Sequence, residues 1–565
     1  MNRRWIIVIV VLFTLPLFVN GQQRIPARQT TVSQSQIPKG STNENWSSYG
    51  GTGLDWRYSS LNQINTSNVK ALLPAWIFQS GDYQDALQST PIVIDGIMYL
   101  SSPHSYVFAL DAATGKLLWQ YKHEPLPGYS PPFGLKSYGV AVSDGKVFIG
   151  TYDDFIVALD QKTGHEVWKV AAEDPTTCRC SISSAPLLVK DKVVIGSSGS
   201  RGFVAAFNVK TGHMDWRFFT VPAAGEPGNE TWSGDMWKRG GVNPWVTGSY
   251  DSELNLVYWG MGDPSPTFYG GSRPGTNLYG DSVVAIDADT GKLCWYHQEI
   301  PHDTWDYDSN WEPVLMDREV DGQMRKLMVH INKSGYTWVL DRTNGTLVNI
   351  YQDNKNITWV KQITPKGEFI GRHDVLEGQE PWLVCPSNLG GKSWNHTAYS
   401  PRTTFLYVPL IEVCNEIVVR RRIEGMPNFG GAIWVMKSPP GHESAYSHID
   451  AINPVTGKLQ WTYQYKYIFL ASMLATGGDL LFTGDPEGEF FALDARTGRK
   501  LWSYQNGAGH RGSPVTYMVK GRQYVAMPTG WGTVTGEIVG VLWPESEKWR
   551  SGSSLVVFAL PKESK

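Results

Sequence analysis

The stretch Ala109-Leu-Asp-Ala-Ala-Thr-Gly-Lys-Leu-Leu-Trp119 is repeated along the chain with the same spacing of Asp, Gly and Trp. In each copy an apolar run ends at an Asp or Asn, a Gly follows four residues later, and a Trp follows after four more, except in one copy. The Gly permits the positive φ of a tight turn, and the flanking runs are typical of strands. The repeat therefore predicts a series of β-hairpins. The further copies are Asp160/Gly164/Trp168, Asn208/Gly212/Trp216, Asp287/Gly291/Trp295, Asp341/Gly345/Asn349, Asn453/Gly457/Trp461 and Asp494/Gly498/Trp502.

The spacing between copies predicts a closed ring of four-stranded blades, because one blade of a propeller takes roughly 40–50 residues before insertions. A linear array of the same hairpins is the alternative, but it would leave unpaired sheet edges that a ring removes. Leu555–Leu560 repeats the strand before the turn and then stops, while Trp76 has a strand but no turn before it. We therefore predict an all-β, eight-bladed β-propeller in which the N- and C-terminal segments complete one blade, with long loops on one face.

The N-terminal segment predicts export. Residues 1–21 carry Arg3 and Arg4, then an apolar run to Val19, and end in small residues, which is the order of a secretory signal peptide. The run is too short for a comfortable membrane span, so we expect no stable span, although an uncleaved anchor is an alternative. Residues 22–46 are polar without periodicity and predict a flexible leader. We expect an exported, periplasmic protein whose residues 47–565 form a single propeller domain.

Composition excludes some partners. The formal net charge is −3 and no basic stripe occurs, so nucleic acid is not an expected partner. The sequence contains no Cys-x-x-Cys-His, the attachment motif of c-type haem. Any electrons that the chain gathers must therefore leave through another molecule.

Three acidic residues in and near the long insertions suggest a cation site. Asp306 and Asp308 are two positions apart, so in extended chain their carboxylates point to one side, and Asp263 lies in the preceding insertion. Three carboxylates could together bind a hard cation, since such ions prefer oxygen ligands. The alternative is that they are ordinary solvated turn residues.

Five segments around these acids resemble the pyrroloquinoline-quinone (PQQ)-dependent alcohol dehydrogenases of the methanol and ethanol type. They span residues 234–238, 244–251, 255–264, 273–281 and 301–308, and the resemblance covers nearly all of the mature chain. It implies an eight-bladed propeller with PQQ near the ring axis. It also implies oxidation of a small alcohol-type substrate and a separate electron acceptor such as a cytochrome c.

The resemblance also implies roles for individual residues. Asp306 matches the catalytic base, and Asp263, Asp306 and Asp308 match positions around a bound Ca²⁺ or lanthanide ion. Asp308 matches the additional acid of the lanthanide-using members, since a trivalent ion favours more negative charge. The predicted cofactor-binding residues are Trp245 under the quinone ring, Lys333 beside the quinone oxygens, and Ser183, Phe133, Ser393 and Trp531.

The chain departs from the family pattern in the cofactor site. The Glu that usually ligates the metal is absent, because Ser198-Gly-Ser200 runs directly into Arg201. The adjacent-cysteine pair is replaced around Phe133, where an aromatic face could take its place. Further departures are Gln88 for a Glu, Tyr138 for an Arg, Asp263 for an Asn and Leu470 for a Trp. A second hypothesis follows, in which the propeller has lost redox activity and acts as a binding or scaffold protein.

The cysteines carry two expectations. Cys385 and Cys414 match paired positions in the family, so we expect a disulfide between them. Cys178 and Cys180 flank one residue, a spacing that strains a bond, so we expect them to be free or reactive.

Overall fold

The computed structural model describes residues 44–131, 134–419, 432–532 and 539–562. The expected signal peptide and nearly all of the expected leader lie outside these residues. The first described segment already packs into the domain, since Trp46 is buried and its backbone pairs with Val93. No described helix is long and apolar enough to cross a membrane.

Eight of the sheets in the described chain form the ring, and we call them blades I to VIII. The prediction of an all-β, eight-bladed propeller is confirmed. Blades I to IV consist of β3 (Ile92–Ile94), β4 (Ile97–Ser101), β5 (Val107–Asp111) and β6 (Leu117–Tyr121); β7 (Ala141–Ser143), β8 (Lys146–Gly150), β9 (Phe155–Asp160) and β10 (Glu166–Ala171); β11 (Leu187–Val189), β12 (Lys192–Ser197), β13 (Phe203–Asn208) and β14 (Met214–Phe219); and β15 (Ser249–Asp251), β16 (Leu256–Gly260), β17 (Ser282–Asp287) and β18 (Leu293–Gln298).

Blades V to VIII follow the same plan, with an additional parallel strand, β1, in blade VII. They consist of β19 (Val314–Val320), β20 (Gln323–Ile331), β21 (Tyr336–Asp341) and β22 (Thr346–Gln352); β26 (Ala398–Ser400), β27 (Phe405–Glu412), β30 (Tyr446–Ile452) and β31 (Leu459–Tyr465); β1 (Tyr58–Ser59), β32 (Leu474–Thr476), β33 (Leu480–Gly484), β34 (Glu489–Asp494) and β35 (Lys500–Gln505); and β36 (Val515–Val519), β37 (Arg522–Thr529), β38 (Ser554–Ala559) and β2 (Leu73–Gln79).

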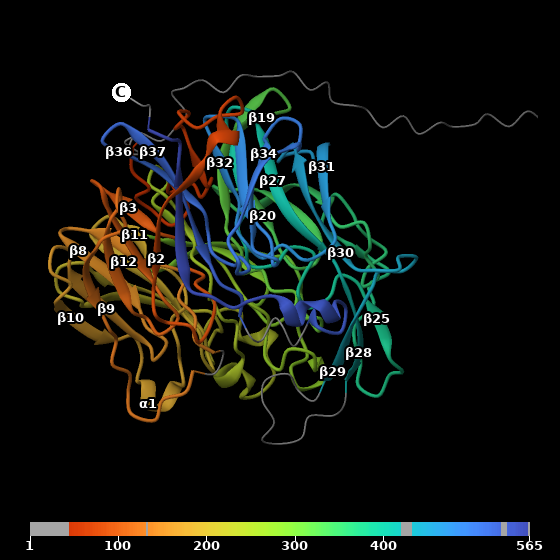
Figure 1. Cartoon of the computed structure of the whole chain (residues 1–565). Coiled ribbons are helices and arrows are strands. Elements are labelled where there is room, and N and C mark those ends of the chain that lie inside the picture. Colours follow the sequence, from red (N-terminus) through yellow and green to blue (C-terminus); the bar gives the residue numbers. More distant parts are fainter. Residues whose placement is uncertain (1–43, 132–133, 420–431, 533–538, 563–565) are drawn as a thin grey trace, which may run out of the picture.

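The two ends of the chain close the ring in blade VIII. The N-terminal strand β2 pairs antiparallel with the C-terminal strand β38, with Trp76 opposite Val557. In Figure 1 the orange β2 accordingly lies beside the blue C-terminal strands. The predicted sharing of one blade by both ends is confirmed, and it joins the ring by backbone hydrogen bonds.

The repeated Gly and Trp act together across most blade boundaries. Gly115 has the positive φ of 73° that its turn needs, but a Cβ there would also lie 2.5 Å from the Trp76 ring of the preceding blade. The indole Nε1 of Trp76 donates to the Ala112 carbonyl in the same turn. At six of the eight blade boundaries a Trp therefore packs on the turn of the next blade, where only Gly leaves room; Trp502 instead donates its indole N–H to the Leu72 carbonyl before β2. The other such contacts are Trp119 on Gly164, Trp168 on Gly212, Trp216 on Gly291, Trp295 on Gly345 and Trp461 on Gly498.

The one repeat without a Trp uses two other side chains. Tyr351 packs its ring on Gly457, and its hydroxyl donates to the Pro454 carbonyl at 3.0 Å. Asn349, which occupies the Trp position, donates to the Val455 carbonyl at 2.7 Å. The ring contact and the hydrogen bond that an indole makes alone are thus shared between a tyrosine and an asparagine.

The long insertions contain the remaining elements, and in Figure 1 several of them lie on the lower side of the ring. A three-stranded sheet is formed by β25, which precedes blade VI, with β28 and β29, which lie between β27 and β30. The inserted elements are α1 (Pro175–Cys178), η3 (Asn229–Thr231), η4 (Met236–Arg239), η5 (Gly270–Ser272), β23 (Gln362–Ile363), β24 (Phe369–Ile370), β25 (Trp382–Val384), β28 (Cys414–Val419), β29 (Ala432–Lys437) and η6 (Pro544–Lys548); η2 (Val69–Ala71) precedes β2.

Both expectations about cysteines are tested by the structure. Cys385 and Cys414 form the expected disulfide, with Cα atoms 4.4 Å apart. The expectation for Cys178 and Cys180 is wrong, because these residues are also joined. The end of α1 turns the chain so that their Cα atoms lie 5.1 Å apart, within the ordinary range for a disulfide. The exposed Cys294 is free.

Candidate functional site

The fold brings one residue from each blade toward the ring axis. The first strand of every blade is its innermost, and the chain enters it from the axis. The residues four positions before these strands are Gln88, Ser137, Ser183, Trp245, Asn310, Trp394, Leu470 and Arg511. Sequence analysis identified Gln88, Ser183, Trp245 and Leu470 through the family resemblance but missed the other four, Ser137, Asn310, Trp394 and Arg511. Their fixed distance from each strand is the signal that would have found them.

The three predicted metal ligands converge beside this axis. Carboxylate oxygens of Asp263, Asp306 and Asp308 all lie within 4.8 Å of one another. The Nζ atom of Lys333 lies 2.7 Å from Asp306 Oδ1 and 2.8 Å from Asp308 Oδ2. Asp308 Oδ1 accepts a hydrogen bond from the Asp263 backbone N–H at 3.0 Å. The arrangement supplies several oxygen ligands of the kind that Ca²⁺ and lanthanide ions prefer.

Burial and mutual repulsion shift the protonation of this group. Burial raises the pKa of Asp306 to about 7, against the attraction of Lys333. Burial and the neighbouring Asp308 raise the pKa of Asp263 well above its usual range. The two carboxylates raise the pKa of Lys333 above its ordinary value, although burial alone would lower it. Without a metal ion the site therefore holds one ammonium and bound protons in place of a cation's charge.

The backbone at Asp306 is held in an uncommon conformation. Its φ is 69°, in the left-handed region. The buried carboxylate of Asp303 accepts hydrogen bonds from the backbone N–H groups of Trp305 and Tyr307, at 2.8 and 2.7 Å, on either side of Asp306. Asp303 is thus a positioning residue that sequence analysis missed, and its place two residues before a backbone donor is typical of an Asx turn.

Trp245 forms an aromatic surface next to the carboxylates. Its ring meets Trp311 edge-on, with ring centroids 5.1 Å apart, and Tyr138 lies 6.3 Å away on the axis. The side chain of Asn310 accepts from the Trp245 backbone N–H at 3.1 Å and donates to Asp308 Oδ1 at 3.3 Å. One amide therefore fixes the aromatic surface relative to the carboxylate group.

The other predicted cofactor residues are placed as follows. Ser183 Oγ donates to the Trp245 carbonyl at 3.1 Å, so the structure brings these two together. Ser393 is buried next to Trp394. Trp531 packs with Leu470 and Trp549 in a separate buried cluster. Phe133 lies outside the described residues.

Several buried polar atoms around the axis have no protein partner among the described residues. They include both amide atoms of Gln88, Oδ2 of Asp263 and Nε of Arg511. Buried polar groups are ordinarily hydrogen-bonded, so such orphans point to a polar ligand. With the flat surface of Trp245, these residues fit a planar, polar, conjugated cofactor and a cation. Trp245, Ser183 and Lys333 would hold the cofactor, and Asp263, Asp306 and Asp308 the ion.

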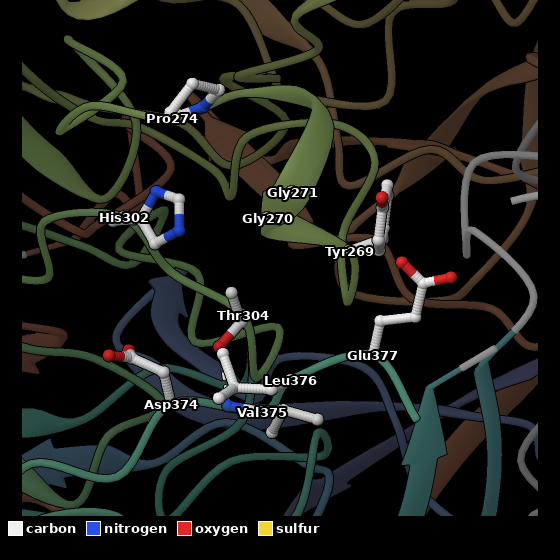
Figure 2. Close-up of a pocket in the computed structure, with 10 residues that line it drawn as sticks. All are labelled: Tyr269, Gly270, Gly271, Pro274, His302, Thr304, Asp374, Val375, Leu376 and Glu377. Atoms are coloured by element: carbon white, nitrogen blue, oxygen red, sulfur yellow. Dashed lines mark hydrogen bonds between the residues drawn. The ribbon is translucent and has the colours of Figure 1, made fainter. Parts of the chain in front are cut away.

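A second pocket lies beside this site but belongs to the insertions. Figure 2 shows it between η5 and the segment around Asp374, with His302 and Thr304 on one wall. The ring Nδ1 of His302 donates to the Gly275 carbonyl at 2.8 Å, and burial lowers the pKa of this histidine, which keeps it neutral. None of the three clustered carboxylates lines this pocket.

Eight blades with Trp contacts between them surround a carboxylate group beside an axial indole, which defines the class as a propeller with its candidate site at the ring axis. A family model described as PQQ: glucose/ethanol/alcohol dehydrogenase, β-propeller domain, matches residues 46–355 and 467–525. The chain belongs to this family of PQQ-dependent quinoprotein dehydrogenases.

The similarity to known proteins covers most of the chain. The quinoprotein alcohol dehydrogenase PedH of Pseudomonas putida is 34% identical, over 98% of this chain and 97% of its own length. The lanthanide-dependent methanol dehydrogenase of Methylorubrum extorquens is 32% identical, over 89% and 92%. Among solved structures, the quinohemoprotein alcohol dehydrogenase of Comamonas testosteroni superposes with a TM-score of 0.85, at 32% identity over 92% of this chain and 81% of that chain. A europium-containing methanol dehydrogenase gives 0.84, at 30% identity over 92% and 99%.

Proposed function

We propose that this protein is an exported PQQ-dependent dehydrogenase that oxidises a small alcohol-type substrate at the axis of the ring. The observation that supports this most is the environment of Asp306. It is a buried carboxylate whose pKa is raised to about 7, and it is held beside two further carboxylates and a lysine. A general base works best when its pKa is close to the working pH.

In this proposal Asp306 accepts the proton of the substrate hydroxyl. Asp303 holds the Asp306 backbone, and Lys333 hydrogen-bonds the carboxylate, so the base has a fixed direction. Bound PQQ would supply the electron sink that takes hydride from the alcohol carbon. Trp245 excludes water from one side of the site and orients a flat ring against the carboxylates.

The metal ion is proposed to bind Asp263, Asp306 and Asp308. A multivalent cation would neutralise the repulsion that otherwise keeps a proton on Asp263 and draws Lys333 onto Asp306 and Asp308. Asp308 adds charge that favours a trivalent ion over Ca²⁺. Two of the similar proteins are described as lanthanide-dependent and europium-containing, which also favours a lanthanide.

Electrons are proposed to pass to a separate acceptor such as a cytochrome c, since the sequence has no Cys-x-x-Cys-His. The N-terminal sequence favours function in the periplasm, where such carriers and extracellular alcohols meet.

A scaffold function is the second candidate, and one observation favours it. Lys333 already forms ion pairs with two of the three carboxylates, so its single positive charge offsets part of their repulsion without a metal ion.

Absorption spectroscopy separates the two candidates. The protein is incubated with PQQ and either Ca²⁺ or La³⁺, freed of excess cofactor, and mixed with ethanol and an artificial electron acceptor. The dehydrogenase proposal expects retained PQQ, a spectral change on adding ethanol, and reduction of the acceptor. Asp306→Asn should retain PQQ but lose turnover, while Asp235→Asn, at an exposed position, should behave as the natural protein does. If PQQ and cations do not bind at all, the scaffold function is supported.

A further inference from the structure

Arg511 is a buried cation that has no hydrogen bond or ion pair among the described residues. The residue is 8% exposed, and its Nε has no acceptor. The guanidinium lies over the Trp394 ring, 5.5 Å from its centroid. Asp85 lies nearby across Gly532 but is not within ion-pair distance. A buried charge without a partner is costly, so its retention points to a ligand that pairs with it.

Arg511 holds the same position in its blade as the residues that line the ring axis. It lies four residues before β36, the position that Trp245 and Ser183 occupy in their blades. Trp394 below it stacks on Tyr138, with ring centroids 5.4 Å apart, and Tyr138 leads on to Trp245. This path of stacked rings connects the Arg511 guanidinium to the Trp245 surface.

Two further donors come from neighbouring blades. Gln88 is 2% exposed, and both of its amide atoms lack partners among the described residues. The backbone around Gln88 lies between two other segments. On one side Ser513 N–H donates to the Ser89 carbonyl, and on the other side Thr90 N–H donates to the Tyr138 carbonyl. Lys136 is therefore on the next loop, and its ammonium also has no partner among the described residues.

The charges that act on Lys136 show which groups its ammonium is near. Burial, and the charges of Arg511 and Lys333, lower the pKa of Lys136 to about 8, while Asp85 and Asp308 oppose the shift. The ammonium therefore interacts with the charges of Arg511, Lys333 and Asp308.

We propose that Arg511, Lys136 and Gln88 form a carboxylate-binding site beside the Asp306–Lys333 pair. Arg511 offers two parallel N–H donors of the geometry that a carboxylate accepts, Gln88 offers an amide N–H, and Lys136 adds a second positive charge. The carboxylate belongs either to the quinone cofactor or to the substrate. In the first case Arg511 would replace the family Arg whose place Tyr138 takes; in the second the substrate would be a hydroxy acid. This assignment of the source rests on the proposed function, whereas the carboxylate chemistry does not.

The first test is independent of quinone chemistry. Quinoline-2-carboxylate is titrated into the protein without PQQ, with tryptophan fluorescence as readout because Trp394 lies under Arg511. The natural protein should bind the acid at least tenfold more tightly than its methyl ester, and Arg511→Met should abolish this preference. Arg511→Lys should restore part of it, and Arg499→Met, an exposed arginine, should leave it unchanged. The proposal is overturned if the natural protein binds acid and ester equally, or if only Arg499→Met loses the preference for the acid.

The melting temperature of Arg511→Met distinguishes a ligand-binding role for Arg511 from a purely structural one. Because the ligand-free guanidinium has no described partner, Arg511→Met should leave or raise the melting temperature of the ligand-free protein. It should also reduce the rise in melting temperature that the bound carboxylate causes. A lowered melting temperature without ligand, together with an unchanged response to the acid, would mean that Arg511 only packs the axis.

Two further arms identify the source of the carboxylate. If it is the cofactor's, Arg511→Met and Lys136→Met weaken PQQ binding at least tenfold but leave the affinity for the PQQ triester unchanged. If it is the substrate's, PQQ affinity is unchanged, while KM for glycolate rises at least tenfold and KM for ethanol does not. If the natural protein binds quinoline-2-carboxylate but not PQQ, the proposed dehydrogenase function fails and the carboxylate site stands. If these variants match Arg499→Met in every arm, the carboxylate site is refuted.

Discussion

Lys333 and Asp306 form a buried ion pair, with Nζ 2.7 Å from Oδ1, and the same ammonium reaches Asp308. The ammonium therefore pairs with one oxygen of each of two carboxylates that could ligate a metal ion. A multivalent cation bound to the same carboxylates would weaken their attraction for Lys333.

The first prediction concerns the choice of metal ion. Asp308→Asn should weaken a lanthanide more than Ca²⁺, by about tenfold or more, since the trivalent ion gains more from each carboxylate; tenfold corresponds to about 1.4 kcal/mol. Terbium luminescence, excited through the nearby indole of Trp245, reports lanthanide binding directly, and competition gives the Ca²⁺ affinity. Asp235→Asn is the matched control on the surface. Equal losses for both ions would contradict the role of Asp308.

The second prediction concerns pH and Asp306. The pKa of Asp306 is about 7 in the folded protein, above its value near 3.8 in the unfolded chain. Between these values the folded state holds the additional proton, so the free energy of unfolding of the metal-free protein should fall as pH rises from about 4 to about 7. Asp306→Asn should flatten this dependence, as measured by denaturant unfolding at several pH values. An unchanged slope in the variant would show that other groups cause it.

A cation should reverse the effect at this residue, because it favours the ionised carboxylate. Adding La³⁺ should therefore stabilise the protein more at pH 7 than at pH 4. The same stabilisation at both values would argue that the ion binds elsewhere.

The third prediction concerns the contact between blades III and IV. Trp216 is buried, packs on Gly291 and donates to the Ala288 carbonyl at 3.1 Å. Trp216→Ala should reduce the free energy of unfolding by about 3–5 kcal/mol. Gly291→Ala should also destabilise, because the added Cβ meets the indole and φ is 71°. Tyr83→Ala, at an exposed ring, is the control, and a loss below about 1 kcal/mol in Trp216→Ala would rule out an anchoring role.

The fourth prediction concerns the two disulfides. Replacing both Cys385 and Cys414 by Ala should cost about 2–4 kcal/mol, since the bond closes a loop across the insertion of blade VI. Cys294→Ser should have little effect, because this thiol is exposed and free. Mass mapping of non-reduced peptides should recover Cys178 joined to Cys180 as well, and alkylation of either without reductant would contradict the structure.

The sequence alone was sufficient for the architecture, because each hairpin is specified locally. Gly115 and its equivalents make the turn, and Trp76 and its equivalents supply the contact with the next blade. Each end of the chain has a strand of the repeat but lacks its turn, which predicts that the two ends share a blade. The replacement of one Trp by Tyr351 and Asn349 could not be foreseen, since it requires knowing which side chain faces the next turn.

The site was predicted only in part. The family resemblance identified Asp263, Asp306, Asp308 and Trp245, but spacing alone could not separate a cation site from solvated turn residues. The structure shows these acids clustered and largely shielded from water. Sequence cannot show this shielding, and a carboxylate becomes a base near neutral pH only where the surrounding chain removes water and adds charge. The tertiary structure likewise decided the pairing of Cys178 with Cys180. It also decided that the segments before blades VIII, I and II, which carry Arg511, Gln88 and Lys136, lie side by side, because the ring closes there.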